Sequence, residues 1–156
     1  MDTVPDPILA GCLLGKFNRA KELGLELYID PESHMSDLPQ HIPIDQLVSM
    51  VGNIIDNTME ACLMQKAYCK QVFVSMTDYG TDLIFEVEDQ GPGIDSKLQA
   101  LIFTKGYSTK SGVDQGIGLH LVQTLAGHLG GYVAMEDVPS GGNLVTISLP
   151  KQAPSL

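Results

Sequence analysis

Residues 45–66 carry a single apolar stripe, and this stripe restricts the possible folds more than any other segment. Its apolar side chains recur at the spacing of an α-helix, at Leu47, Val48, Val51, Ile54, Ile55, Met59 and Cys62. Pro43 precedes the segment, and Asp45 suits a helix N-cap. Two strand-like segments, 71–77 and 82–88, follow around a turn. Because a helix with one apolar face must bury it against another element, the sequence predicts a helix packed on a β-hairpin.

The rest of the chain repeats this combination of helices and strands. Helical spacing of apolar residues predicts helices over 7–22 and 116–129, and alternation predicts strands over 25–29, 132–137 and 144–149. Hairpins beside helices are typical of a mixed β-sheet with helices on one face. The predicted fold class is therefore an α/β two-layer sandwich.

Length and composition fit one globular domain and argue against several kinds of partner. The 156 residues are 44% hydrophobic and carry a net charge of −10. Nucleic acids and anionic membrane surfaces attract basic proteins, so the acidic balance argues against both. The first residues lack the pattern of a signal peptide, and no apolar stretch is long enough to span a bilayer. Three cysteines without a CxxC motif predict free thiols in a reducing compartment.

The polar face of the 45–66 helix is the first candidate site. Asn53, Asn57 and Glu60 are spaced i, i+4 and i+7, so that they project from one side of the helix. Two carboxamides and a carboxylate offer oxygen ligands that suit Mg²⁺, which normally arrives with phosphates and keeps several waters. The plain alternative is a solvated helix face.

The glycine-rich stretch 89–116 holds a second candidate. Asp89 closes a strand and is followed by Gly91 and Gly93. A carboxylate there can accept a hydrogen bond from an exocyclic amine, while the glycines let a ligand ring approach the backbone. A tight turn after the strand explains the same residues without a ligand.

Two further features of this region suit a polyanion. Residues 96–113 contain lysines and no acid, a local reversal of charge in an acidic chain, at Lys97, Lys105 and Lys110. Gly116 and Gly118 open the predicted helix, whose N-terminus would present free N–H groups and a positive dipole to phosphate. A solvated loop and a glycine N-cap are the corresponding alternatives.

In this order the motifs resemble the ATP-binding catalytic domain of sensor histidine kinases, in the superfamily shared by gyrase, Hsp90, histidine kinases and MutL. The resemblance covers roughly residues 20–150 and implies the Bergerat ATP-binding fold. The matching segments are the N box at 46–61, the first glycine box at 87–94, the F box and lid at 102–110, the second glycine box at 116–122 and the last strand at 141–150. The segments 5–16, 19–24, 52–57 and 116–122 are similar to the citrate and C4-dicarboxylate sensor kinases in particular.

The resemblance implies a role for each candidate residue. Asp89 would bind the adenine amino group, with Gly91 and Gly93 close to the ring. Asn57 would be the main Mg²⁺ ligand, with Asn53 nearby on the triphosphate side. The remaining nucleotide-binding residues would be the phosphate-binding Lys105, Lys110, Gly116 and Gly118, together with Leu119 of the second glycine box and Thr146 behind the adenine.

Two positions depart from the family pattern. In the ATP-hydrolysing branches a glutamate stands at the position of Asn53 and acts as general base on water. Asn53 cannot take a proton, which favours phosphoryl transfer to a side chain over hydrolysis and argues against a gyrase-like or MutL-like ATPase. Many histidine kinases have a lysine at the position of Glu60, and a glutamate there would act through Mg²⁺ or orient a partner.

The resemblance also implies what the chain lacks. No histidine followed by an acidic residue stands on an amphipathic helix, so the phosphoacceptor would come from a hairpin domain outside the chain. We expect residues 1–22 to be the tail of that dimerisation and phosphoacceptor hairpin, 23–150 to be the catalytic domain, and 151–156 to be a C-terminal tail.

The function expected from the resemblance is that of a protein-histidine kinase domain that uses ATP and Mg²⁺. It would be the cytoplasmic part of an inner-membrane sensor, homodimeric at full length and acting on a response regulator. Two alternatives stay open: a protein-serine kinase of the anti-sigma-factor kind, and a non-catalytic interaction module gated by nucleotide.

Overall fold

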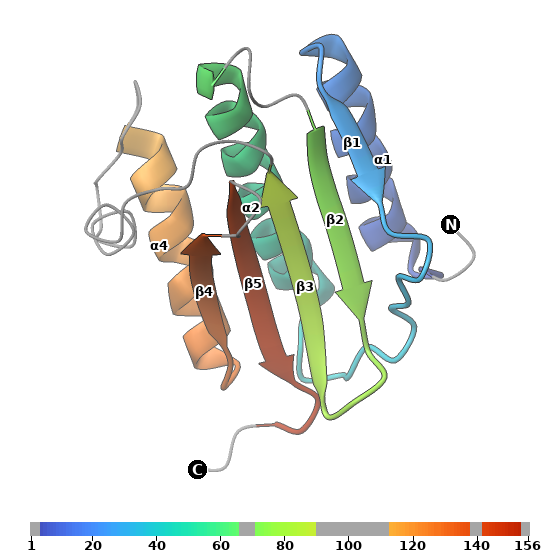
Figure 1. Ribbon diagram of the computed structural model, residues 1–156. Coiled ribbons are helices and arrows are strands. Elements are labelled where there is room, and N and C mark those ends of the chain that lie inside the picture. The colour runs from blue at the N-terminus through green and yellow to red at the C-terminus, as the bar shows by residue number, and fades with distance from the viewer. Residues whose placement is uncertain (1–3, 66–70, 90–112, 138–141, 154–156) are drawn as a thin grey trace.

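The computed structural model describes residues 4–65, 71–89, 113–137 and 142–153. These residues form a five-stranded mixed β-sheet with helices packed on one of its faces (Figure 1). The two layers are the predicted α/β sandwich, and the predicted fold class is confirmed.

The sheet has the strand order β1-β2-β3-β5-β4. β1 pairs with β2 in parallel, and all other neighbours are antiparallel. The strands are β1 (Glu26–Ile29), β2 (Gln71–Thr77), β3 (Asp82–Asp89), β4 (Tyr132–Asp137) and β5 (Asn143–Pro150). β2–β3 and β4–β5 are the two predicted hairpins, joined in the middle of the sheet by β3 and β5.

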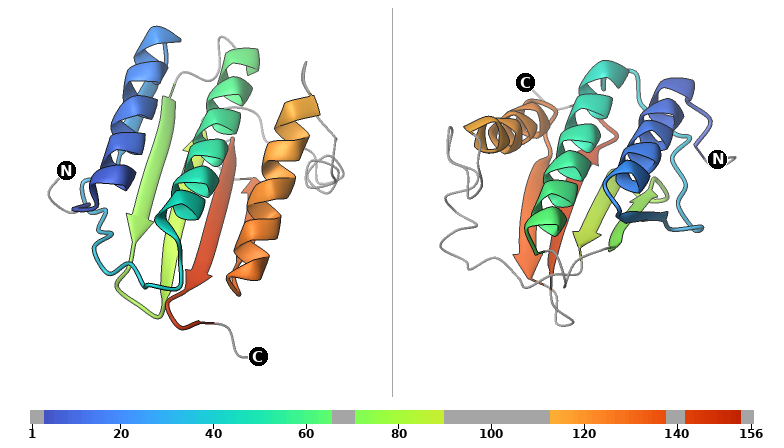
Figure 2. Two further views of the ribbon diagram at one scale, coloured as in Figure 1. Left: turned by 180° about the vertical axis from the view of Figure 1, so that it is seen from behind. Right: turned by 90° about the horizontal axis from the view of Figure 1, so that it is seen from above.

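The described helices lie side by side on one face of the sheet, with α2 between α1 and α4 (Figure 2). They are α1 (Pro7–Glu22), α2 (Ile44–Gln65) and α4 (Val113–His128). Asp6 caps α1, because its carboxylate accepts the backbone N–H groups of Ile8 and Leu9 at 2.9 and 3.0 Å.

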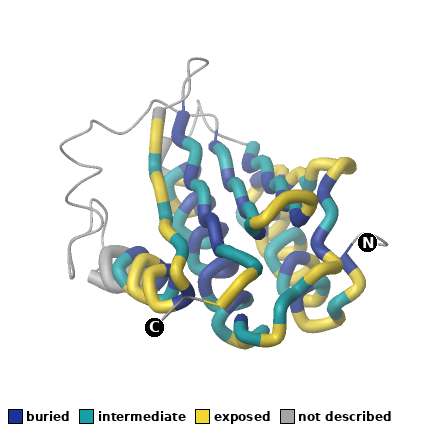
Figure 3. The backbone as a smooth tube through the Cα atoms, turned by 90° about the horizontal axis from the view of Figure 1, so that it is seen from below, coloured by how far each residue is buried: buried dark blue, intermediate teal, exposed yellow. Residues whose placement is uncertain are grey.

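The core lies between the helices and the sheet (Figure 3). Alternate residues of each strand point inward, as in β2, where Val72, Val74 and Met76 are buried. Leu9 and Leu13 of α1 are fully buried in the same core. α1 thus packs with the predicted catalytic domain, and its continuation into a preceding hairpin stays a prediction.

A buried aspartate ties the loop between β1 and α2 to the β2–β3 turn. Asp78 is 3% exposed, and its Oδ1 accepts from Nδ1 of His34 at 2.7 Å. Its Oδ2 accepts the backbone N–H groups of Ser36 and Asp37 at 2.8 and 2.7 Å. Burial raises the pKa of Asp78, but these hydrogen bonds outweigh burial and hold the pKa below its ordinary value.

The cysteines differ from the prediction. Cys62 is fully buried at the end of α2 and is disulfide-bonded, so the expectation of free thiols is wrong for this residue. Cys12 is a half-exposed free thiol on α1, and burial raises its pKa. Spacing alone does not reveal which thiols the fold brings within bonding distance. Among the described helices, none is both long and apolar enough to cross a membrane.

Candidate functional site

Segments that are far apart in the sequence meet at one end of the strands, which is the upper end of the sheet in Figure 1. β3 ends there and β5 begins there, while α2 runs toward this end and α4 starts beside it. α4 also packs directly against α2. Asp89 is the last residue of β3, and Asn57 lies in the C-terminal half of α2, which runs toward the same end of the sheet.

Asp89 is the last residue of β3, and its side chain lies on the helix-covered side of the sheet. Burial alternates along β3, and Asp89 belongs to the buried set, with 5% of its surface exposed. The backbone N–H of Asn143 donates to its Oδ1 at 3.2 Å. Such hydrogen bonds are needed because an uncompensated buried carboxylate is costly. Asp89 is therefore a hydrogen-bond acceptor held at the end of β3 on the helix-covered face of the sheet.

Gly142 and Asn143 position Asp89, although neither is predicted as a site residue. Gly142 has a φ of +98°, and a Cβ atom on it would lie 2.0 Å from the carbonyl oxygen of Asp89. Only glycine fits such a close approach in this backbone conformation. The run Gly141-Gly142-Asn143 ahead of the last strand is the sequence signal that could have indicated this role.

The N-box side chains stand on α2. Nδ2 of Asn53 donates to the carbonyl oxygen of Ser49 at 2.7 Å, which fixes the orientation of the carboxamide. Asn53 and Asn57 are half-buried, and Glu60 is exposed. Within the described ranges, no cluster of three or more His, Cys, Asp or Glu side chains could hold a metal ion alone. This donor set fits Mg²⁺ when phosphate and water supply the other ligands.

Glu60 is on the same helix as Asn53 and Asn57, and it also lines a groove between α1 and α2. The groove has a volume of about 820 Å³ and is also lined by Lys16 and Asp56. Nζ of Lys16 lies 2.9 Å from Oδ2 of Asp56, which links the two helices. Asp56 precedes Asn57 directly, so this ion pair lies next to the predicted Mg²⁺ ligand in the sequence.

The second glycine box is placed differently from the prediction. α4 begins at Val113, so Gly116 and Gly118 lie within its first two turns and do not open it. Glycine adopts helical angles at an entropic cost of about 1 kcal/mol, which tertiary packing readily outweighs. Leu119 is 5% exposed and belongs to the hydrophobic core. Its side chain is a packing residue beside the site.

Thr146 does not lie with the other residues. It pairs with Glu86 on β3 and Ala134 on β4, and alternation along β5 directs it to the face of the sheet away from the helices. Its neighbours Val145 and Ile147 take the inward positions. The other predicted nucleotide-binding residues, Gly91, Gly93, Lys105 and Lys110, lie outside the described residues.

Comparison with known proteins agrees with this geometry. Residues 43–153 match the family model described as histidine kinase-, DNA gyrase B- and HSP90-like ATPase. The chain belongs to this family. The match contains α2, all strands from β2 to β5, and α4, so it includes Asn53, Asn57 and Asp89.

The similar curated proteins are sensor kinases. The chain is 40% identical to the sensor protein CitS of Halalkalibacterium halodurans, over 97% of this chain and 28% of that protein. It is 39% identical to the sensor histidine kinase CitA of Klebsiella pneumoniae, over 93% of this chain and 26% of that protein. The chain therefore spans about a quarter of the length of these relatives.

Solved structures show the same fold. The catalytic domain of the histidine kinase ThkA superposes with a TM-score of 0.74 at 18% identity, covering 94% of this chain and 92% of that chain. Full-length ShkA in complex with AMPPNP superposes with a TM-score of 0.71 at 23% identity, covering 96% of this chain and 30% of that chain. Both superpositions therefore cover more than nine-tenths of this chain.

Proposed function

We propose that this chain is the ATP-binding catalytic domain of a sensor histidine kinase. It transfers the γ-phosphate of ATP to a histidine on a hairpin domain that is not part of this sequence. The observation that carries the proposal is Asp89, a buried carboxylate fixed at the end of β3, on the helix-covered side and within the matched segment. The 40% identity to a sensor kinase over nearly the whole chain supports the same function.

In this proposal each residue has a definite task. The carboxylate of Asp89 accepts a hydrogen bond from the adenine amino group, which gives the site its preference for adenine over guanine. The carboxamide oxygen of Asn57 holds Mg²⁺, which would neutralise charge on the triphosphate. Lys105 and Lys110 bind phosphates. Because α4 begins at Val113, the N–H groups of Gly116 and Gly118 would be paired within the helix, and phosphate binding would fall to residues before them.

Asn53 decides between transfer and hydrolysis. A carboxamide cannot accept a proton from water, so the site lacks a general base at this position. Phosphoryl transfer depends mainly on positioning and charge neutralisation, and a histidine nucleophile brought by the hairpin needs no such base. Glu60 lines the groove between α1 and α2, and its proposed role is to act through Mg²⁺ or to orient that partner rather than to bind phosphate.

The first experiment is calorimetric titration of a non-hydrolysable ATP analogue with Mg²⁺ into the wild type and Asp89→Asn. We expect wild-type binding that is at least about tenfold weaker in the variant, the effect of losing a charge-assisted hydrogen bond. Glu86→Gln is the matched control, because it removes the same charge from the same strand on the opposite face. Equal affinity of Asp89→Asn and the wild type would contradict the proposal.

The second experiment tests the transfer itself. Radiolabelled γ-phosphate is followed onto a separately expressed hairpin fragment of the related Klebsiella pneumoniae kinase. We expect an acid-labile label, as a phosphohistidine gives. An acid-stable label on serine would favour the anti-sigma-factor type of kinase, and tight binding without any transfer would favour the interaction module.

For the full-length protein we propose a membrane-bound homodimer that passes its phosphate to a response regulator. The names of the relatives as sensor proteins and sensor histidine kinases support this arrangement. The sensed ligand would be citrate or a C4-dicarboxylate, as the resemblance to the citrate and C4-dicarboxylate sensor kinases implies. A relative named as a probable C4-dicarboxylate sensor kinase is 36% identical to this chain. Binding of citrate and succinate to the complete protein, measured by calorimetry, tests the ligand class.

A further inference from the structure

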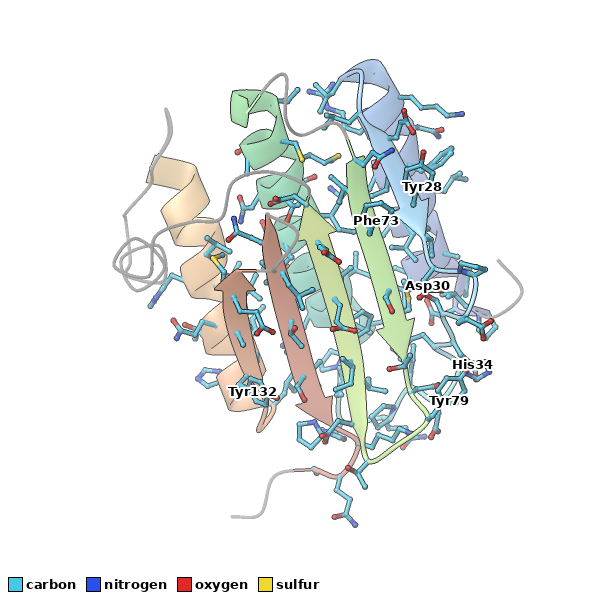
Figure 4. All side chains as sticks on the ribbon, in the orientation of Figure 1. Tyr28, Asp30, His34, Phe73, Tyr79 and Tyr132 are labelled. Carbon is cyan, nitrogen blue, oxygen red and sulfur yellow. The ribbon has the colours of Figure 1, made fainter. Side chains whose placement is uncertain are left out.

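The face of the sheet opposite the helices is open. All the described helices pack on the other face, and no described element covers this one (Figure 2). Figure 4 looks directly onto it and shows Tyr28, Phe73 and Tyr132 at its surface. Such an uncovered face either stays solvated or receives a partner, and its side chains distinguish the two cases.

Apolar side chains are spread over this open face. The rings of Tyr28 and Phe73 stack across β1 and β2, with centroids 5.3 Å apart and planes inclined by 17°. Tyr28 is 42% and Tyr132 59% exposed, at the two edge strands. Ile84 and Leu144 are half-buried between them. The aromatic residues are amphipathic contact groups of the kind that is enriched at protein interfaces.

The charged side chains of the open face all have one sign. Alternation along the strands directs acidic residues to this side, namely Glu26, Asp82, Glu86, Glu88 and Glu136. None of the described strands β1 to β5 contains a lysine or an arginine. Solvated sheets usually pair opposite charges across neighbouring strands, and this pairing is missing here.

The pairing of the strands places acidic side chains next to apolar ones on the open face. One row across the sheet runs Phe73, Glu88, Leu144 and Glu136, from β2 through β3 and β5 to β4. The next row contains Glu86 between Ser75 and Thr146. A partner on this surface would thus meet carboxylates and apolar patches within one strand spacing of each other.

We propose that the open face docks a basic amphipathic segment of a partner protein, whose lysines or arginines pair with the carboxylates while its apolar side contacts the aromatic groups. Charge selects this occupant. A second copy of the chain would bring the same acidic face and be repelled, and nucleic acids or anionic lipids would be repelled in the same way. The proposal goes beyond nucleotide binding and is independent of it, because the face is turned away from α2 and Asp89.

The test uses a synthetic leucine–lysine peptide with a helical repeat as the probe and amide NMR shifts of the full chain as the readout. We expect shifts at the strands of the open face and not along α1, α2 or α4. The double variant Glu86→Gln and Glu88→Gln should bind the peptide about tenfold more weakly, since each partly exposed ion pair contributes a severalfold change in affinity.

The matched control is the double variant Glu22→Gln and Glu32→Gln, which removes the same charge from exposed positions off the open face. It should bind the peptide within about twofold of the wild type. A leucine–glutamate peptide of the same pattern should not bind. The proposal is overturned if no shifts occur at low salt, if they fall on the helices, or if both double variants weaken binding equally.

Discussion

Two buried aspartates lie at opposite ends of the strands, and their hydrogen-bond partners differ. Asp78 follows β2 and is 3% exposed, whereas Asp89 ends β3 and is 5% exposed. Both oxygens of Asp78 accept hydrogen bonds from a single loop, at His34, Ser36 and Asp37. Asp89 accepts a hydrogen bond from the backbone N–H of Asn143, at the opposite end of the strands.

The difference shows that burial of a carboxylate does not by itself indicate a binding site. Asp78 and Asp89 have the same side chain and nearly the same burial. The carboxylate of Asp78 fixes the loop between β1 and α2, so its role is structural. Asp89 lies at the end of the sheet where we propose that the nucleotide binds, and its proposed role is to bind the adenine.

The largest effect is expected for Asp78→Ala. The variant leaves the backbone N–H groups of Ser36 and Asp37 without their acceptor, and we expect the free energy of unfolding to fall by about 3 kcal/mol. Urea unfolding followed by circular dichroism measures this change. Glu32→Gln, in the same loop but exposed, should change stability by less than about 0.5 kcal/mol. Weakened nucleotide binding by folded Asp78→Ala would break the distinction between the two aspartates.

Gly142→Ala should affect both stability and binding. The new Cβ would meet the carbonyl oxygen of Asp89 at 2.0 Å in a backbone with φ of +98°. We expect a loss of about 2 kcal/mol in stability together with at least about tenfold weaker binding of the ATP analogue. Gly24→Ala is the matched control, because Gly24 has a φ of +77° with no atom within 4 Å of its Cβ position.

Gly24→Ala should therefore show the cost of the backbone strain alone, about 1 kcal/mol, with unchanged nucleotide affinity. Thermal unfolding and calorimetric titration of the two variants give both quantities. If Gly142→Ala kept wild-type affinity, Gly142 would not position Asp89.

Acidification should weaken the fold through Asp78. The pKa of Asp78 is lower in the folded protein than in the unfolded chain, so its stabilising effect is complete above the unfolded value of about 3.9 and is lost as pH falls through the folded value. We expect stability to fall more steeply below about pH 4 in the wild type than in Asp78→Asn. Parallel pH profiles of the two proteins would contradict this assignment.

Periodic patterns explain why most of the fold could be predicted. The apolar stripe of α2 and the alternation in β2 and β3 are local signals, and the structure reproduces both. Alternation also predicts that Thr146 points away from the helices, because Val145 and Ile147 take the apolar positions. The family pattern places Thr146 behind the adenine, against this local signal. The start of α4 differs from the prediction because the two glycines lie inside the helix and do not mark its boundary.

Contacts between distant segments could not be predicted from one sequence. Asp78 receives hydrogen bonds from residues that lie more than 40 positions earlier, and Asn143 is 54 positions after Asp89. Asp89 can be predicted as a site residue because the glycines that follow it form a recognisable motif. Asp78 has no such motif, because it lies in an ordinary turn sequence.

The smallest effect is expected for Lys16→Met, which removes the ion-pair partner of a third carboxylate, that of Asp56. The side chain of Asp56 is 47% exposed, and its partner Lys16 is 25% exposed. Water screens such a pair, so its removal should lower stability by no more than about 0.5 kcal/mol, and methionine retains the packing of the lysine stem. A double-mutant cycle with Asp56→Asn measures the interaction. Although Asp56 adjoins Asn57, we expect unchanged nucleotide affinity in Lys16→Met. A severalfold change in nucleotide affinity would mean that the α1–α2 ion pair positions Asn57. The partly exposed carboxylate of Asp56 would then belong to the nucleotide site, although it is not buried as Asp78 and Asp89 are.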